Sequence, residues 1–171
     1  MTNQFNWHIS NLTIEHLEAV IKIEKETYSD PWTMAFWNYE LKHNSHSYYL
    51  GAWAGEELIG YGGMRLLFKK AHITNLTVKK DWQNKGVGTS LMAFLLEEAL
   101  KRKVKDVVLE VRESNYNAQK LYSKFFFKSI GVFNNYYKGE KAVVMVLSNL
   151  SAYRGNLNKL IEKFKACIRP G

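Results

Sequence analysis

A glycine-rich turn is the part of this sequence where residue type and spacing most clearly suggest chemistry. It has the sequence QNKGVGTS over residues 83–90, follows the run NLTV and precedes an apolar segment with helical spacing. A helix that begins here would direct unpaired backbone N–H groups and the positive end of its dipole toward a ligand. Gly86 and Gly88 would let an anion such as a phosphate group approach the backbone closely. The alternative is a tight strand-to-helix turn without a ligand.

The spacing of the glycines argues against two common nucleotide-binding loops. A Walker A loop requires the pattern G-x-x-x-x-G-K-[ST], which is absent from this turn. A dinucleotide fingerprint requires a third glycine three residues after Gly88, where the chain has Leu91. The turn is therefore a candidate anion site, but of neither of these two kinds.

Two ionisable side chains lie in elements that follow the glycine turn. Glu110 is an acid inside the apolar run DVVLEV, and Tyr122 follows Asn115 by seven residues. Seven residues are about two helical turns, so Asn115 and Tyr122 can face one cleft. By themselves these residues also fit structural roles, because Glu110 could pair with a lysine at the sheet edge and Tyr122 could be a core tyrosine. His72 is a further, weaker candidate for a base.

The surrounding pattern predicts the elements that would position these residues. Helices are expected over 12–28 and 29–41, where Thr13 and Thr33 are suitable N-caps. Two aromatic-rich runs joined around Gly55 predict a hairpin over 47–68. The other expected elements are a strand at 71–78, a helix that starts at the glycine turn and ends in KRKVK, a strand at 106–111, a helix at 114–127 and a strand at 142–147. This order predicts one mixed α/β domain with a single central sheet.

Apolar stripes predict which helix faces are buried. In the second helix, Phe36, Trp37 and Leu41 are expected to face inward. The segment 156–168 predicts an amphipathic helix with a lysine-rich opposite face. Its apolar stripe consists of Leu157, Leu160, Ile161, Phe164 and Ile168. We expect this stripe to pack on its own domain, although it could also dock on a partner or an anionic surface.

Composition restricts the class of protein. The chain has 171 residues, 46% of them hydrophobic, which suits one globular domain with a sizeable core. No apolar run approaches the roughly 20 residues of a membrane span, and no secretory leader is recognisable, so a cytoplasmic protein is expected. The single cysteine, Cys167, excludes an internal disulfide and a cysteine-based metal cage. We expect no metal cofactor and a monomer or weak dimer.

The motifs resemble those of the GNAT superfamily of N-acetyltransferases, which bind acetyl-coenzyme A (acetyl-CoA). QNKGVG resembles the pyrophosphate loop Q/R-x-x-G-x-G/A of that superfamily. The stretches DPWTMAFWNYEL, ITNLTV, LEVRESNYNAQKLY and NYY resemble, in order, the signatures of its RimI-like subfamily, which acetylates the N-terminal alanine of a small-subunit ribosomal protein. The resemblance covers roughly residues 7–147, so residues 1–150 would form the acetyltransferase domain and 151–171 a basic tail.

The resemblance implies a fold and a set of site residues. The fold would be a mixed, mostly antiparallel sheet flanked by helices and splayed around the acetyl-CoA cleft. Glu110 would be the general base and Tyr122 the general acid, and the backbone N–H of Val78 would stabilise the oxyanion. Residues 76–78 would pair with the pantetheine arm, and Asn115 would bind near the thioester. The implied cofactor-binding set is Leu76, Thr77, Val78, Asn84, Lys85, Gly86, Val87, Gly88, Thr89 and Asn115.

Several positions depart from the subfamily's usual pattern. The chain has Phe125-Phe126-Phe127 where Leu-Gly-Phe is usual, which could alter the turn after the helix. Lys69 and Lys70 stand where acids are common, Phe133 stands where arginine is frequent, and Lys141 stands where aspartate is usual. These changes leave acetyl transfer intact but put the identity of the acceptor in doubt. A less basic acceptor would explain them, and so would surface substitutions without a functional role.

Two other functions fit parts of the sequence. An acetyltransferase of the same superfamily could act on a protein lysine or a small amine. A basic nucleic-acid-binding module on the same fold is suggested by residues 69–150, which carry 15 basic against 7 acidic residues. However, no helix-turn-helix, zinc-finger or RNA-binding aromatic signature is present, so we expect a protein N-terminus as the partner and no direct contact with nucleic acid.

Overall fold

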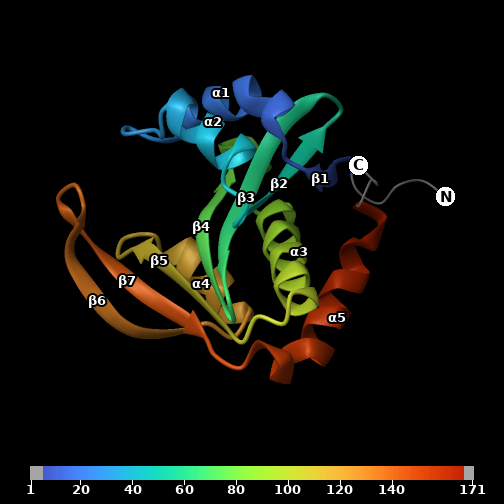
Figure 1. Cartoon of the computed structure of the whole chain (residues 1–171), viewed down its shortest axis with the longest axis vertical. Coiled ribbons are helices and arrows are strands. Elements are labelled where there is room, and N and C mark those ends of the chain that lie inside the picture. The colour runs from blue at the N-terminus through green and yellow to red at the C-terminus, as the bar shows by residue number, and fades with distance from the viewer. Residues whose placement is uncertain (1–5, 168–171) are drawn as a thin grey trace.

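The chain forms one mixed sheet that is covered by helices (Figure 1). The computed structural model describes residues 6–167. In this range the sheet has seven strands in the order β1-β2-β3-β4-β5-β7-β6. The strands are β1 (His8–Asn11), β2 (Ser47–Ala54), β3 (Glu57–Leu67), β4 (Lys70–Val78), β5 (Asp106–Arg112), β6 (Lys128–Tyr137) and β7 (Glu140–Leu147). All neighbouring pairs are antiparallel except β4 and β5, which confirms the predicted mixed, mostly antiparallel α/β fold.

The helices form two layers. The helices α1 (Leu17–Thr27) and α2 (Met34–Lys42) lie together over β2 and β3, with their own apolar core. The helices α3 (Val87–Lys101) and α5 (Arg154–Phe164) pack together in the larger core under the sheet. The remaining helix, α4 (Tyr116–Lys124), connects β5 to β6. Figure 1 shows α1 and α2 on one side of the sheet and α3 and α5 on the other.

Two buried acids fix α1 and α2 to the sheet. Glu24 on α1 accepts hydrogen bonds from the Tyr61 hydroxyl and, at 2.8 Å, from the Trp32 backbone N–H. Glu40 on α2 lies 2.7 Å from the Arg65 guanidinium and also accepts a hydrogen bond from the Tyr49 hydroxyl at 2.9 Å. Because buried charges are costly without partners, these bonds hold α1 and α2 in defined positions over β2 and β3.

The sheet opens between its two parallel strands. The strands β4 and β5 pair only where residues 70–72 face residues 106–108. Beyond this point β5 pairs with β7 and β4 pairs with β3, so no described strand fills the gap between β4 and β5. Figure 1 shows β5, β6 and β7 bending away from β2, β3 and β4. This opening is the splay that the resemblance implies.

The C-terminal helix packs on the protein's own core, as predicted. Leu157, Ile161 and Phe164 are buried in the larger core, and α5 lies against α3. Leu160 is partly buried beside them, and the predicted stripe residue Ile168 lies outside the described residues. No helix in the described range is long and apolar enough to cross a membrane.

Three details differ from the prediction. The strands β1 and β6 were not expected, because β1 has four residues and β6 is exposed along almost its whole length. Phe36 is exposed rather than inward-facing, whereas Trp37 of the same helix is fully buried.

The predicted cap is confirmed, since Thr33 Oγ1 accepts a hydrogen bond from the Phe36 N–H.

Candidate active site

The glycine turn lies at the start of α3 and needs glycine for its backbone. Gly86 is the N-cap of α3 and has φ +89°, a left-handed conformation that other residues adopt at a cost. Asn84, in the same turn, also has a positive φ of 59°. The left-handed backbone at Asn84 and Gly86 therefore sets the shape of the turn in front of the first N–H groups of α3. A Cβ added at Gly86 would lie 3.3 Å from the Phe164 ring, so α5 packs against this turn.

Gly88 has a packing role that the sequence did not indicate. A Cβ at this position would lie 3.3 Å from Leu121 on α4 and 3.6 Å from Val78 on β4. The absence of a side chain lets α3, α4 and β4 approach one another closely. The tight-turn explanation is thus supported for Gly88, and the turn remains compatible with a phosphate ligand.

Side chains attach the glycine turn to the end of β4. Gln83 donates a hydrogen bond of 3.1 Å from its amide nitrogen to the Val78 carbonyl oxygen. The Lys85 ammonium lies 5.1 Å from the centre of the Trp82 ring, within the range of a cation–π contact. Val87 is fully buried and anchors the first turn of α3, beside the half-buried Thr89. These contacts hold the predicted pyrophosphate loop at the end of β4, where the gap between β4 and β5 is open.

The free edge of β4 presents backbone groups to the gap. The Lys79 N–H donates a hydrogen bond of 2.9 Å to the Ile59 carbonyl oxygen on the β3 side. Because antiparallel ladder bonds alternate, Thr77 also directs its backbone to β3, whereas Leu76 and Val78 direct theirs toward the gap. The Val78 N–H thus faces the space between β4 and β5, where an extended ligand could add to the strand.

Tyr28 contacts β4 beside the gap, although no pattern in the sequence marks it as a candidate residue. Its hydroxyl lies 2.7 Å from the hydroxyl of Thr77, which is buried on β4. Burial raises the pKa of Tyr28 above its usual value. Tyr28 follows the last residue of α1, 49 positions before Thr77, so only the tertiary fold brings the two together. No local pattern in the sequence marks this contact.

Glu110 forms a close pair with His72 across the parallel strands. His72 Nε2 lies 2.5 Å from Glu110 Oε2, and the two side chains are 37% and 15% exposed. Because His72 pairs with Val108 and side chains alternate along a strand, His72 and Glu110 share one face of the sheet. The Tyr137 hydroxyl donates a hydrogen bond of 3.3 Å to the Glu110 backbone oxygen. The structural alternative, a lysine partner for Glu110, is not what the fold provides, because the carboxylate pairs with a histidine.

Tyr122 is almost completely buried on α4, at 7% exposure. Burial raises the pKa of its hydroxyl well above 10, and the nearby Tyr28 and Tyr137 raise it further. Within the described residues this hydroxyl has no hydrogen-bond partner in the protein. The phenol therefore stays protonated at neutral pH, which is the form that a proton donor requires.

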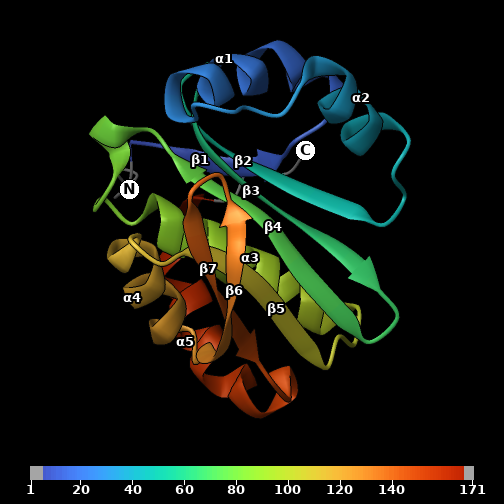
Figure 2. The same cartoon turned by 90° about the vertical axis from the view of Figure 1, so that its left-hand side faces the viewer.

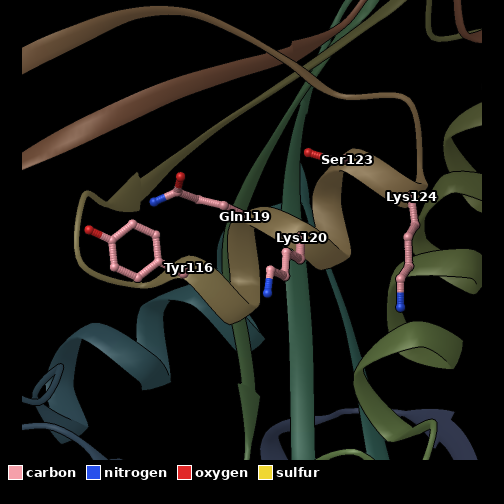
Figure 3. Close-up of a pocket in the computed structure, with 5 residues that line it drawn as sticks. All are labelled: Tyr116, Gln119, Lys120, Ser123 and Lys124. Atoms are coloured by element: carbon pink, nitrogen blue, oxygen red, sulfur yellow. The ribbon is translucent and has the colours of Figure 1, made fainter.

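The face of α4 that points away from the core adds two positive charges. Tyr116, Gln119, Lys120, Ser123 and Lys124 line an open cavity of about 610 Å³. Figure 3 shows that Lys120 and Lys124 extend from the same side of the helix. Lys120 precedes Leu121, the residue that packs against Gly88, so it lies near the start of α3. Asn115 caps α4, since its Oδ1 accepts a hydrogen bond of 3.1 Å from the Ala118 N–H.

A splayed mixed sheet, a glycine turn at a helix start and a carboxylate beside the gap define an acyltransferase of the GNAT type. Residues 17–127 match the family described as Acetyltransferase (GNAT) family. The match covers more than half of the chain, so the protein belongs to the GNAT acetyltransferase family.

Individual relatives carry the names of N-terminal acetyltransferases. A candidate ribosomal protein bS18-alanine N-acetyltransferase of Bacillus subtilis is 32% identical over 80% of this chain and 92% of its own length. An N-alpha-acetyltransferase of Sulfolobus acidocaldarius is 30% identical over 83% of this chain and 92% of its own length. The crystal structure of the ribosomal-protein-S18-alanine N-acetyltransferase from Escherichia coli superposes with a TM-score of 0.77 at 26% identity, covering 84% of this chain and 94% of that chain.

Proposed function

We propose that this protein transfers the acetyl group of acetyl-CoA to the N-terminal alanine of a small-subunit ribosomal protein. The observation that carries this proposal is the Glu110–His72 pair at the narrow end of the gap between β4 and β5. The pair places a proton acceptor beside the free backbone edge of β4. The names of the relatives support the choice of an N-terminal amine as acceptor.

The residues of this chain suit a coenzyme that carries several phosphate groups. The N–H groups at the start of α3 and the left-handed Gly86 would hold the pyrophosphate, together with Asn84, Lys85 and Thr89. The backbone of Leu76 and Val78 would pair with the pantetheine arm. When bound, acetyl-CoA supplies an acetyl group that is activated as a thioester.

Each remaining task in the reaction has a suitable group. An α-amino group with a pKa of about 7.7–8.0 arrives partly protonated, so Glu110 would accept its proton directly or through a water. The neutral nitrogen then attacks the acetyl carbon, and the Val78 N–H faces the gap where negative charge develops on the acetyl oxygen. As the carbon–sulfur bond breaks, the Tyr122 hydroxyl would supply a proton to the departing sulfur and would regain one, directly or through water, from the nitrogen, which loses its second proton as the amide forms. Tyr28 and Thr77 would hold β4 in place during these steps.

The test combines site variants with a panel of acceptors. We expect Glu110→Gln and Tyr122→Phe to lower kcat by about 10²-fold or more, since general acid–base catalysis contributes on that scale. Their Kd for acetyl-CoA, measured by calorimetry, should stay within about twofold of the wild-type value. Matched controls are Glu113→Gln and Tyr116→Phe, which alter exposed residues on the same elements or next to them. Full turnover in both site variants would disprove the assigned roles.

The acceptor panel tests the finer part of the proposal separately. It contains a peptide that starts with alanine, the same peptide with its N-terminus already blocked, a lysine-containing peptide and a polyamine. We expect acetylation of the free alanine peptide and none of the blocked one, as read by mass spectrometry. A preference for the lysine peptide or the polyamine would refute the N-terminal acceptor while leaving acetyl transfer intact.

A further inference from the structure

The turn between β3 and β4 exposes an aromatic side chain in an unfavourable backbone conformation. Phe68 is 101% exposed and has φ +53°, which a bulky residue adopts rarely. The turn has only two residues between the paired positions Leu67 and Lys70, and such turns favour glycine or asparagine where φ is positive. Leu67 is also 57% exposed. No contact within the described chain explains an aromatic residue at this tip.

Exposed lysines lie in the same hairpin tip and in the loop that is hydrogen-bonded to it. The Lys105 N–H donates a hydrogen bond of 2.6 Å to the Lys69 carbonyl oxygen, which joins the hairpin tip to the loop after α3. Lys69, Lys70, Lys103 and Lys105 are all exposed, and none has an ion-pair partner among the residues described. The nearby acids Glu97 and Glu98 are already paired with Lys101 and Arg102. Asp106 is paired in register with Lys70 and accepts a hydrogen bond from the Asn149 N–H, so four lysines stand against one further carboxylate here. We define Leu67, Phe68, Lys69, Lys70, Lys103 and Lys105 as the tip patch.

The tip patch is remote from the glycine turn. It lies at the first residue of β4, whereas the glycine turn follows its last residue, and the strand of nine residues spans roughly 30 Å at about 3.3 Å per residue. Figure 2 shows the β3–β4 hairpin tip on the opposite side of the molecule from α4. A ligand on the tip patch would thus leave the proposed coenzyme site free.

We propose that the tip patch binds single-stranded RNA, with Phe68 stacked on a base and the four lysines contacting phosphates. Basic side chains combined with an exposed aromatic ring are the features that bind single strands without strong sequence preference. An anionic membrane surface is less suitable, because only two apolar side chains project here and interfacial binding scales with buried apolar area. This choice rests in one respect on the proposed function, since ribosomal proteins assemble with RNA. This proposal runs against the sequence-based expectation of no direct contact with nucleic acid, and the experiment below decides between the two.

The experiment measures binding of a fluorescein-labelled RNA of roughly 12 nucleotides to the full chain by anisotropy, at several salt concentrations. Phe68→Gly suits the positive φ and removes the ring, so it should keep the fold and weaken binding by about tenfold. The double variant Lys69→Gln/Lys103→Gln should reduce the salt slope by about 0.7 for each lysine. Its matched control is Lys159→Gln/Lys163→Gln, which removes the same charge from the exposed face of α5 and should leave the slope unchanged.

Two further measurements separate this proposal from its alternatives. Acetylation of a free peptide should stay within twofold in every variant, so loss of RNA binding and loss of catalysis are distinguishable. Vesicles of phosphatidylserine and phosphatidylcholine provide the membrane arm. Equal weakening by the α5 control, unchanged RNA binding in Phe68→Gly, or tighter binding to vesicles than to RNA would each overturn the proposal.

Discussion

At the scale of single residues, Glu110 and His72 illustrate what a strand pattern can and cannot predict. From the residues alone Glu110 fits a structural role equally well, and its assignment as general base comes from the family resemblance. His72 was a weaker candidate, since its distance to Glu110 depends on the parallel register of β4 and β5. That register is a tertiary property, and it places the two side chains 2.5 Å apart. Tyr28 escaped prediction for the same reason, because its contact with Thr77 spans 49 positions.

The first prediction concerns His72. We expect His72→Gln to lower kcat by about tenfold, because the histidine orients Glu110 through their close contact while the carboxylate itself remains. The KM for acetyl-CoA should not change, since His72 lies at the narrow end of the gap and not in the glycine turn. Steady-state kinetics check both values. His46→Gln, which alters an exposed histidine in a loop, is the control.

A double variant distinguishes a shared role from two separate ones. If His72 acts through Glu110, Glu110→Gln/His72→Gln should be no slower than Glu110→Gln alone. Losses that multiply would contradict the positioning role, as would an unchanged kcat in the single histidine variant.

At the scale of elements, the end of α4 shows how the fold accommodates a sequence that departs from its family. Phe126 stands where the related pattern has glycine, and it keeps the left-handed turn with φ +67°. Its ring stacks on Tyr153, with centroids 4.4 Å apart and planes 18° from parallel. Tyr153 belongs to the short 3₁₀ helix Leu150–Tyr153 that leads into α5. A stacking partner thus compensates for the strained backbone at this turn.

The second prediction is a double-mutant cycle on this stack. Phe126→Gly should relieve strain of about 1–2 kcal/mol but lose a larger burial term, so the variant should be slightly less stable than the wild type. Tyr153→Ala should cost less in the Phe126→Gly background than in the wild type, with a coupling of about 1 kcal/mol. Urea denaturation gives the four free energies of unfolding. The stacked pair Phe133 and Tyr136 on the exposed β6 is the comparison, and Tyr136→Ala should cost less than about 0.5 kcal/mol. Purely additive losses at Phe126 and Tyr153 would disprove the compensation.

Prediction of elements succeeded where periodicity reflects burial and failed where it does not. The helix α3 has a fully buried apolar stripe and follows a glycine turn, so its position was predictable. The strand β6 is almost wholly exposed and has no alternation, so nothing in its local pattern indicates a strand. It forms because β7 provides a paired edge. The short β1 likewise depends on β2 for its hydrogen bonds.

At the scale of the whole molecule, buried phenols connect stability to alkaline pH. Burial raises the pKa of Tyr48 and of Tyr137 to about 12, and it raises the pKa of Tyr49, Tyr61 and Tyr122 as well. An unfolded tyrosine loses its proton near pH 10, so only the unfolded state deprotonates between about pH 10 and 12. Stability from these groups is thus fully present below pH 10 and decreases as the pH rises toward 12.

The third prediction follows from this loss of stability at alkaline pH. The melting temperature should be nearly constant from pH 8 to about 9.5 and should fall steeply between about pH 10 and 12. Absorbance at 295 nm should show that the native protein ionises part of its tyrosines only when it unfolds. The same chain in concentrated urea, where all tyrosines should ionise near pH 10, provides the reference. Coincident titration curves for the native and unfolded chain would contradict burial of these hydroxyls.

The last prediction uses Cys167 to report whether α5 stays docked. Burial raises the pKa of this thiol to about 11, so at neutral pH the native protein holds the unreactive protonated form. A thiol reagent should therefore label the native protein far more slowly than the unfolded chain. Leu157→Ala removes a buried contact between α5 and the core and should speed labelling at least tenfold, because losing such a side chain costs about 2–5 kcal/mol. Lys159→Ala, on the exposed face of the same helix, should leave the rate unchanged. Since Phe164 lies against Gly86, fast labelling in the wild type would mean that α5 does not support the glycine turn.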